Sequence, residues 1–240
     1  MVGQGFKGFS MPVLPGSPPV EVHLKRSARA RRFSLRVSRL DGKVTLSMPA
    51  RAREGEALAF LKGNEGWLRQ TLSEMPGPVP QGVGPGLVIP VEGSELVLTA
   101  GTGRGVRVEA DRLLVPGDPV TMGPRVAAWL KVLARDRLAA ASTRYADMVG
   151  RRYASLAIRD TRSRWGSCSP DGRLMYSWRL IMAPPPVLDY VAAHEVAHLV
   201  ELNHSPAYWK VVTGICPDWK VHRNWLKTHG SGLHRLRFQD

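Results

Sequence analysis

The stretch PPPVLDYVAAHEVAHLVELNHSPAYW, residues 184–209, contains an H-E-x-x-H motif at His194, Glu195 and His198. Positions four apart lie on one face of a helix, so the two imidazoles can point at one metal ion. Glu195 lies beside that face, where a carboxylate can take a proton from a metal-bound water. The apolar residues around the motif predict a buried helix. A chance match is expected in only about one chain in a hundred of this His and Glu content.

His204 is the predicted third ligand, provided that the helix stops before it. In a continuous helix, a residue six beyond His198 would lie about 240° around the axis and face away from the metal. Asn203 tolerates the left-handed conformation that ends helices, and Ser205-Pro206 is typical of an N-cap and first turn of a new helix. A sharp turn can therefore return His204 to the metal, and three histidines leave one coordination position open.

Composition bounds the kind of protein. The chain has 240 residues, of which 43% are hydrophobic, enough for one large domain or two small ones. No apolar run is long enough to span a bilayer, and the first ten residues do not resemble a signal peptide. The two cysteines, Cys168 and Cys216, form no C-x-x-C pair and fit a reducing compartment. We therefore expect a cytoplasmic protein without a membrane partner.

The pattern along the chain predicts four segments. Residues 1–19 are rich in Gly and Pro and are expected to form a flexible tail. Residues 20–119 are expected to form a β-rich N-terminal part with one helix over 53–72, residues 120–232 the metal-binding domain, and residues 233–240 a frayed basic tail. Within the first part, alternating apolar residues on either side of Asp41-Gly42 predict a β-hairpin.

The domain from residue 120 is expected to begin with a long amphipathic helix that ends at Gly150. Short strands are expected over 156–158 and 173–182, and helices over 205–213 and 218–229. A strand at 173–182, just before the metal-binding helix, could form a sheet edge to which an extended peptide adds. An ordinary buried strand is an equally good interpretation of the same residues.

Net charge is the second informative property. The chain carries a formal charge of +14, which attracts polyanions without specifying one. Seven basic residues follow Val22 before any acidic residue: Lys25, Arg26, Arg29, Arg31, Arg32, Arg36 and Arg39. They fit either a solvated strand face or a strip that binds a polyanion or the substrate.

The motifs from residue 164 onward resemble those of the YgjP-like metallopeptidases, small zincins related to the SprT-like and WLM metalloproteases. The matching residues are Arg164-Trp-Gly-Ser-Cys168, Trp178-Arg-Leu180, Ala183-Pro184, Asp189-Tyr-Val191, His194-Glu-Val-Ala-His198, Asn203-His-Ser205 and Tyr208-Trp209. The resemblance implies an α+β minimal zincin fold of helices packed on a small sheet. It also implies one Zn²⁺ held by His194, His198 and His204, with Glu195 as the catalytic acid/base.

The chain departs from the better-known zincins. The spacing from His198 to His204 equals that of metzincins, but Glu201 stands where their pattern has glycine. No Met follows His204, which excludes a downstream Met-turn, and no Glu follows Glu201 to serve as a gluzincin ligand. The poorer alternatives to His204 as third ligand are Asp218, His222, His229 and His234.

These observations predict a zinc metallopeptidase that hydrolyses a polypeptide of unknown identity. Arg164, Arg179 and Tyr208 are candidates for oxyanion or substrate contacts, and Asp189 for a histidine partner or a helix-start charge. The alternative function is a DNA-associated protein that acts on, or docks at, DNA-bound proteins, although no DNA-reading motif is present. A pseudo-enzyme with structural zinc would not need Glu195.

Overall fold

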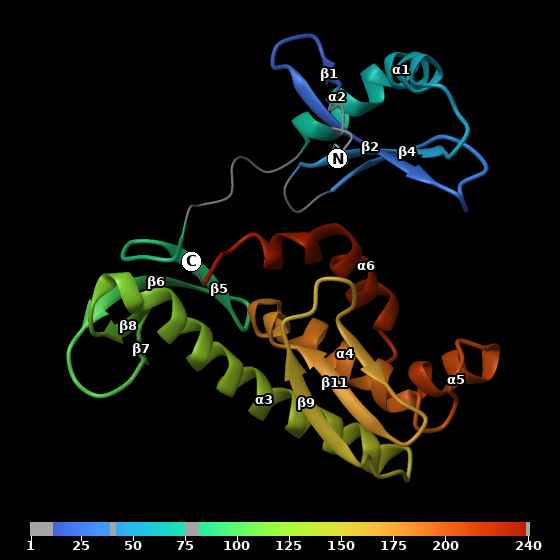
Figure 1. Ribbon diagram of the computed structural model, residues 1–240. Helices are drawn as coiled ribbons and strands as arrows, with labels where there is room; N and C mark the ends of the chain where they lie inside the picture. Colours follow the sequence, from blue (N-terminus) through green and yellow to red (C-terminus); the bar gives the residue numbers. More distant parts are fainter. Residues whose placement is uncertain (1–11, 39–41, 75–81, 239–240) are drawn as a thin grey trace, which may run out of the picture. The chain divides into compact units, whose positions relative to one another are not determined.

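The structure is a computed structural model that describes residues 12–38, 42–74 and 82–238. It contains two compact units, residues 1–79 and 80–240, each with its own hydrophobic core (Figure 1). Both combine helices with small mixed sheets, which confirms the predicted α+β class. No helix among the described residues is long and apolar enough to cross a membrane.

The first unit is a four-stranded sheet packed against two helices. Its strands are β1 (Val13–Leu14), β2 (Val20–Ser27), β3 (Ser34–Val37) and β4 (Val44–Pro49), in the order β1-β2-β4-β3. Strands β3 and β4 form the predicted hairpin, in which Gly42 has a φ of 70° that suits its turn, while Asp41 lies outside the described residues. Helices α1 (Glu54–Gly63) and α2 (Glu65–Ser73) replace the single helix expected over 53–72.

The predicted flexible tail is wrong for its described part. Leu14 of β1 pairs with Val20 of β2 and is only 6% exposed, because it joins the core of the first unit. Residues 1–11 of that tail lie outside the described residues.

The boundary between the units lies near residue 80, whereas the sequence suggested residues 119 and 120. The second sheet, of strands β5 (Val88–Val91), β6 (Ser94–Gly101), β7 (Arg107–Glu109) and β8 (Arg112–Pro116), belongs with the C-terminal half. The tip of its first hairpin explains this assignment. The Glu92 carboxylate binds Arg137, and the Glu92 N–H donates to the carbonyl oxygen of Ile181 over 2.8 Å.

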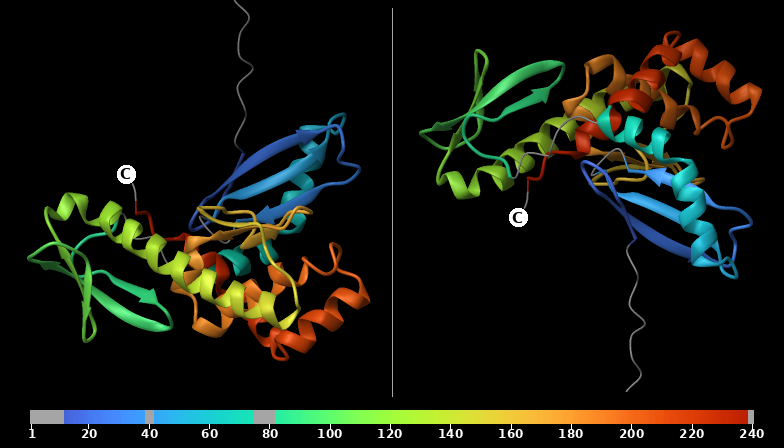
Figure 2. Two further views of the ribbon diagram at one scale, coloured as in Figure 1. Left: turned by 90° about the horizontal axis from the view of Figure 1, so that it is seen from below. Right: turned by 90° about the horizontal axis from the view of Figure 1, so that it is seen from above.

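The long helix α3 (Met122–Met148) is the spine of the second unit, as the amphipathic pattern predicted. Its buried side includes Val126, Leu130, Ala134 and Leu138, which recur at helical spacing. Figures 1 and 2 show α3 running from the β5–β8 sheet, past the helix that carries the H-E-x-x-H motif, to a third sheet.

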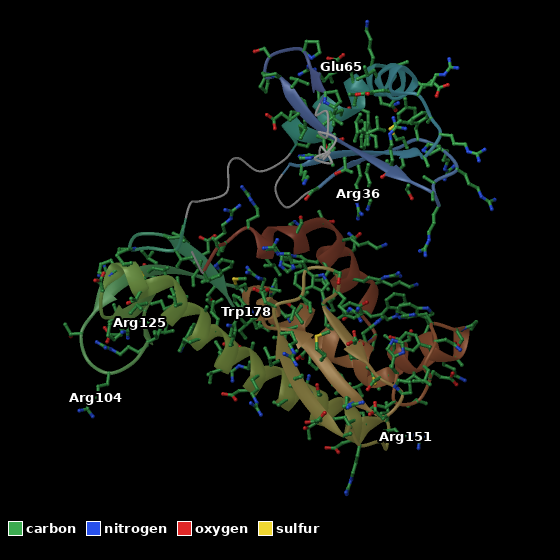
Figure 3. The ribbon with its side chains drawn as sticks, viewed as in Figure 1. Arg36, Glu65, Arg104, Arg125, Arg151 and Trp178 are labelled. Atoms are coloured by element: carbon green, nitrogen blue, oxygen red, sulfur yellow. The ribbon has the colours of Figure 1, made fainter. Side chains whose placement is uncertain are left out.

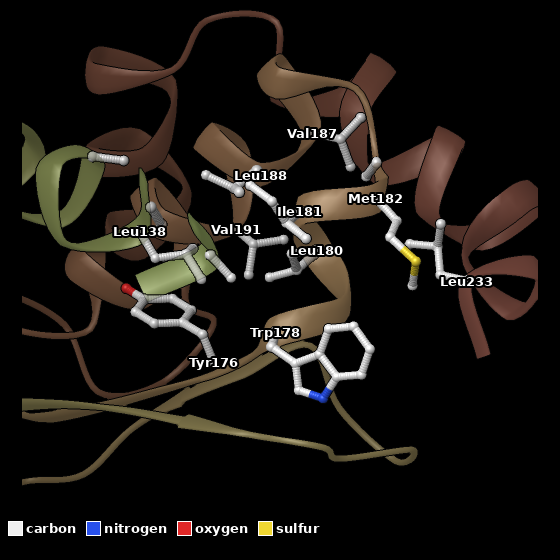
Figure 4. Close-up of a cluster of buried hydrophobic side chains, with 14 of the residues drawn as sticks. Leu138, Tyr176, Trp178, Leu180, Ile181, Met182, Val187, Leu188, Val191 and Leu233 are labelled. Carbon is white, nitrogen blue, oxygen red and sulfur yellow. The ribbon is translucent and has the colours of Figure 1, made fainter. Parts of the chain in front are cut away.

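The third sheet has the order β10-β11-β9, from β9 (Ser155–Arg159), β10 (Gly166–Cys168) and β11 (Arg173–Ser177). The strand expected over 173–182 is therefore wrong in its second half, where a 3-10 helix, η2 (Trp178–Met182), follows Ser177. All five residues of η2 are buried, so their β-like composition reflects burial rather than a strand. Figure 4 shows Leu180 and Ile181 beside Val191 in the core.

Three helices complete the unit: α4 (Pro185–Ala197), α5 (Pro206–Ile215) and α6 (Trp219–His229). A final 3-10 helix, η3 (Gly230–His234), leads into a C-terminal segment that is not frayed up to residue 238. Leu233 and Phe238 are 6% and 3% exposed, and the carbonyl oxygens of Leu233 and Leu236 accept hydrogen bonds from Arg179. The prediction of a frayed tail rested on the basic residues of this segment and overlooked the buried side chains of Leu233 and Phe238.

Candidate metal centre

Helix α4 carries the H-E-x-x-H motif at its C-terminal end. Two prolines in its first turn suit the start of a helix, and its apolar face is buried, with Ala192, Ala193, Val196 and Ala197 fully inaccessible to solvent. His194 is partly buried and His198 is 8% exposed, and their ring centroids are 5.3 Å apart. The i, i+4 spacing thus brings both imidazoles to one side of the helix end.

His204 returns to this pair through a sharp turn. Its Nε2 lies 3.1 Å from Nε2 of His194, and the ligand atoms of His194, His198 and His204 all lie within 4.8 Å of one another. Helix α4 ends at Ala197 with His198 as its C-cap, earlier than the Asn203 stop that the sequence suggested. Asn203 does not adopt the left-handed conformation; among the described non-glycine residues, only Glu92 and Ala110 have a positive φ.

The second part of the predicted turn is confirmed. Ser205 is the N-cap of α5, its Oγ accepts the N–H of Tyr208 over 3.2 Å, and Pro206 occupies the first turn. This cap fixes where α5 begins and so limits the path open to His204.

Two further contacts orient the imidazoles. Nδ1 of His198 lies 3.0 Å from the carbonyl oxygen of Glu201; because a carbonyl only accepts, Nδ1 carries the hydrogen and Nε2 keeps its lone pair. The Tyr208 hydroxyl donates to the carbonyl oxygen of His194 over 2.9 Å, and its ring stacks on His198 with centroids 4.5 Å apart. Tyr208 thereby contacts both histidines of the H-E-x-x-H motif, one through its hydroxyl and the other through its ring.

The surroundings of His194 and His198 favour neutral imidazoles by lowering the pKa of each. Burial, together with the neighbouring His198 and His204, lowers the pKa of His194 to about 3. Burial also lowers the pKa of His198. Neutral imidazoles are the form that binds a metal, so these side chains are ready to act as ligands near neutral pH.

Glu195 is held in a dry position beneath the edge strand β10. It is 5% exposed, and burial raises its pKa to about 8, with the positive charge of Arg164 acting in the opposite direction. A Cβ on Gly166 would lie 2.6 Å from Glu195 Cγ and Oε1, so the strand passes against the carboxylate only because residue 166 is glycine. A buried carboxyl with a raised pKa is suited to exchange protons near neutral pH.

The other predicted site residues occupy three different settings. Arg164 is exposed and close enough to Glu195 to influence its pKa. Arg179 is buried, binds both carboxylate oxygens of Asp160 and two C-terminal carbonyls, and has little donor capacity left for a substrate. Tyr208 is fully buried with its hydroxyl committed to His194. Neither Arg179 nor Tyr208 therefore suits the predicted oxyanion or substrate contact.

Asp189 does not contact a histidine. Its carboxylate binds Arg144 of α3 over 2.7 Å, which ties α4 to the long helix. The alternative third ligands Asp218, His222, His229 and His234 take no part in the His194–His198–His204 group, which alone satisfies metal-site spacing among the described residues. Of these, His234 instead stacks on Trp165, with centroids 4.9 Å apart.

The sequence did not predict a group of aromatic and cationic side chains that lies beside the three histidines. Trp209 of α5 stacks on Trp219 of α6 with centroids 4.3 Å apart, and the Arg223 guanidinium lies over both rings. Trp209 in turn approaches His194 and His204, with centroids 6.0 and 5.8 Å away. The i, i+4 spacing of Trp219 and Arg223 was the available signal, but it did not reveal which side of α6 faces the histidines.

The donor set fits a metal ion of intermediate softness. It consists of three imidazoles without a thiolate or carboxylate in the group, an arrangement that suits zinc and leaves a coordination position open. The buried Nδ1 of His194 has no hydrogen-bond partner among the described residues, and its ring is flanked by the rings of Tyr208 and Trp209.

Comparisons with known proteins give a family match and a similar solved structure. The family model described as YgjP-like, metallopeptidase domain, matches residues 31–229, which include the three histidines and Glu195. Among solved structures, the chain is similar to the metallopeptidase zymogen of Pyrococcus abyssi abylysin, with 20% identity and a TM-score of 0.36, over 38% of this chain and 92% of that one. Among curated proteins, none matches the sequence significantly.

Proposed function

The chain belongs to the YgjP-like metallopeptidase family, and from this premise we propose that it is a zinc-dependent peptidase. His194, His198 and His204 would hold the ion, and Glu195 would act as general base and acid. The observation that carries the proposal is the buried Glu195 carboxyl, which adjoins the three-histidine group beneath an edge strand. A purely structural zinc site would have no need of such a carboxyl.

When bound, zinc would act as a Lewis acid toward the scissile carbonyl and the attacking water. Glu195 would accept a proton from that water and deliver it to the leaving amine. Its pKa, raised to about 8 by burial, would fall beside a bound cation, which favours the ionised base before attack. Removal of Glu195 would therefore stop turnover without removing a ligand.

The substrate would lie along β10. This strand is at the edge of the sheet order β10-β11-β9 and contacts α4, so its free side is available to an extended peptide. The sequence left open whether residues 173–182 form a sheet edge or an ordinary buried strand; β11 is the central strand of its sheet and pairs on both sides. Arg164, just before β10, is the better placed cation for charge that develops on the scissile carbonyl.

Elemental analysis together with peptide cleavage tests the proposal. Purified wild type and Glu195→Gln should each retain about one zinc per chain, whereas His204→Ala should retain much less. Wild type should cleave members of an unbiased peptide library, and Glu195→Gln should lose that activity by at least about 100-fold. Equal zinc retention without His204, or cleavage that persists in Glu195→Gln, would overturn the assignment of ligands or of base.

A further inference from the structure

One end of the first unit's sheet gathers arginines from separate loops. Strands β2 and β4 are parallel and in register from Val22↔Val44 to Ser27↔Pro49, so the loops that follow them leave the sheet at the same end. The first loop, residues 28–33, carries Arg29, Arg31 and Arg32, and the second, residues 50–53, carries Arg51 and also Arg53, which is the N-cap of α1. We call Arg29, Arg31, Arg32 and Arg51 the arginine cluster.

A fifth arginine ties these loops together. The Nη1 of Arg26, at the end of β2, donates to the carbonyl oxygens of Ala50 and Ala52 over 3.2 and 2.7 Å. The loop after β4 is therefore attached to the strand that leads into the other loop. The cluster is thus a positioned feature of the fold.

The cluster is exposed, and its charge is not balanced locally. All four side chains are exposed, and none forms an ion pair within the described part of the chain. Residues 22–53 contain ten basic side chains against one acidic side chain, Asp41. The nearby Glu56 carboxylate is occupied by the N–H of Arg53 over 2.9 Å. Such concentrated like charge destabilises the folded state through self-repulsion, and a bound partner of opposite charge would relieve it.

The open face of the sheet extends the cluster with cations and hydroxyls. Leu24, Leu35 and Leu46 pack in the core, so the alternating residues of the same strands face the other way. Across β2, β4 and β3 these form the rows Lys25–Ser47–Ser34 and His23–Thr45–Arg36. Figure 3 shows Arg36 directed away from α1 and α2.

The side chains of this surface favour a phosphate backbone in a duplex over a lipid surface or a single strand. Arginine forks match the oxygens of phosphates, and serine and threonine hydroxyls add neutral donors. Insertion into a lipid surface would require apolar residues within the cluster, but the exposed large apolar side chains of the described first unit are Val13, Leu58 and Trp67, on other elements. Single strands require exposed aromatic platforms, whereas Phe33, the aromatic residue of these loops, is stacked on Phe60.

We propose that the arginine cluster and the adjoining sheet face bind the phosphate backbone of double-stranded nucleic acid, without reading its sequence. This inference goes beyond the proposed peptidase function and does not depend on it. Four to five phosphate contacts would make the logarithm of the association constant fall with log salt with a slope of about −4.

Fluorescence anisotropy of the full-length protein with a labelled 20-base-pair duplex tests the proposal. The test variant replaces Arg29, Arg31, Arg32 and Arg51 with Gln. The control replaces four exposed arginines of the other unit with Gln, namely Arg104, Arg135, Arg151 and Arg152, so that net charge is the same. We expect the test variant to bind at least about tenfold more weakly at 100 mM salt, with a slope reduced by about 3 to 4, and the control to change less than about threefold.

Four outcomes would overturn the proposal. They are equal weakening by the two variants, no duplex binding by wild type at low salt, much tighter binding of single strands than of duplex, and binding of anionic lipid vesicles in place of duplex. Circular dichroism of both variants excludes unfolding as the cause. Binding requires neither metal nor Glu195, so Glu195→Gln should bind the duplex like wild type, and a failure of the peptidase proposal leaves this test intact.

Discussion

Gly166 supplies the sharpest test of how the site works. A Cβ at this position would lie 2.6 Å from Cγ and Oε1 of Glu195, about 1 Å inside ordinary non-bonded contact. Gly166 is not among the glycines with positive φ, so alanine suits its backbone and the collision is the main perturbation. We predict that Gly166→Ala displaces the Glu195 carboxylate by about 1 Å and lowers kcat about 100-fold, which is about 2.7 kcal/mol in the barrier.

The assay combines kcat on the best library peptide with zinc content. Zinc should stay at the wild-type level, because the three atoms nearest to the new Cβ all belong to Glu195 rather than to a histidine. Gly214→Ala is the matched control: it lies in α5 of the same unit, where an added Cβ meets nothing within 4 Å. A kcat within about threefold of wild type at full zinc occupancy would refute the reasoning, and loss of zinc would show that the strand supports the ligands instead.

Two further substitutions separate support of the fold from support of the site. Arg179→Met should lower the free energy of unfolding by about 2–4 kcal/mol in chemical denaturation, because Asp160 and two backbone carbonyls lose their hydrogen-bond donor. The control Arg173→Met breaks an exposed ion pair and should cost at most about 1 kcal/mol. Burial raises the pKa of the Asp160 carboxyl, but the hydrogen bond and charge of Arg179 lower it overall. The ion pair therefore stabilises the fold above the unfolded pKa of about 4, and this stabilisation is lost as the pH falls further. The pH–stability curve of Arg179→Met should lack this loss. Tyr208→Phe keeps the ring on His198 but removes the hydrogen bond to the His194 carbonyl, and should weaken zinc affinity about tenfold in competition with a chelator; unchanged affinity would contradict its bracing role.

The parts of the fold that the sequence revealed are those with a local cause. The β3–β4 hairpin, the long helix α3 and the Ser205 cap each follow from residues close together in the chain, through a turn, a repeat of apolar positions or a capping side chain. The features that were missed depend on distant partners. Residues 178–182 form a 3-10 helix because they fill the core between α3 and α4, and their composition alone matches a buried strand equally well.

The unit boundary and the C-terminal segment were misjudged for the same reason. A Pro/Gly-rich loop near residue 80 and Asp118-Pro119 are both plausible breaks in sequence. Contacts of Glu92 with Arg137 and Ile181 decide between them, because they join the β5–β8 sheet to the second unit. Likewise, Arg179 holds the carbonyls of Leu233 and Leu236, more than 50 residues away, so a basic segment without periodicity is ordered nonetheless.

The candidate site divides along the same line. His194, Glu195, His198 and His204 span eleven residues, so helix geometry and one turn are enough to predict that they converge. Gly166 and Arg223 reach the site from other elements, and the residues around them in the sequence do not show that they lie beside Glu195 or the histidines. The Glu195 carboxylate leaves no room for a Cβ at residue 166, and the Arg223 guanidinium lies over two indoles that come from different helices. The proposed ligands and base are thus encoded locally, whereas the burial that raises the pKa of Glu195 arises only when β10 packs on α4.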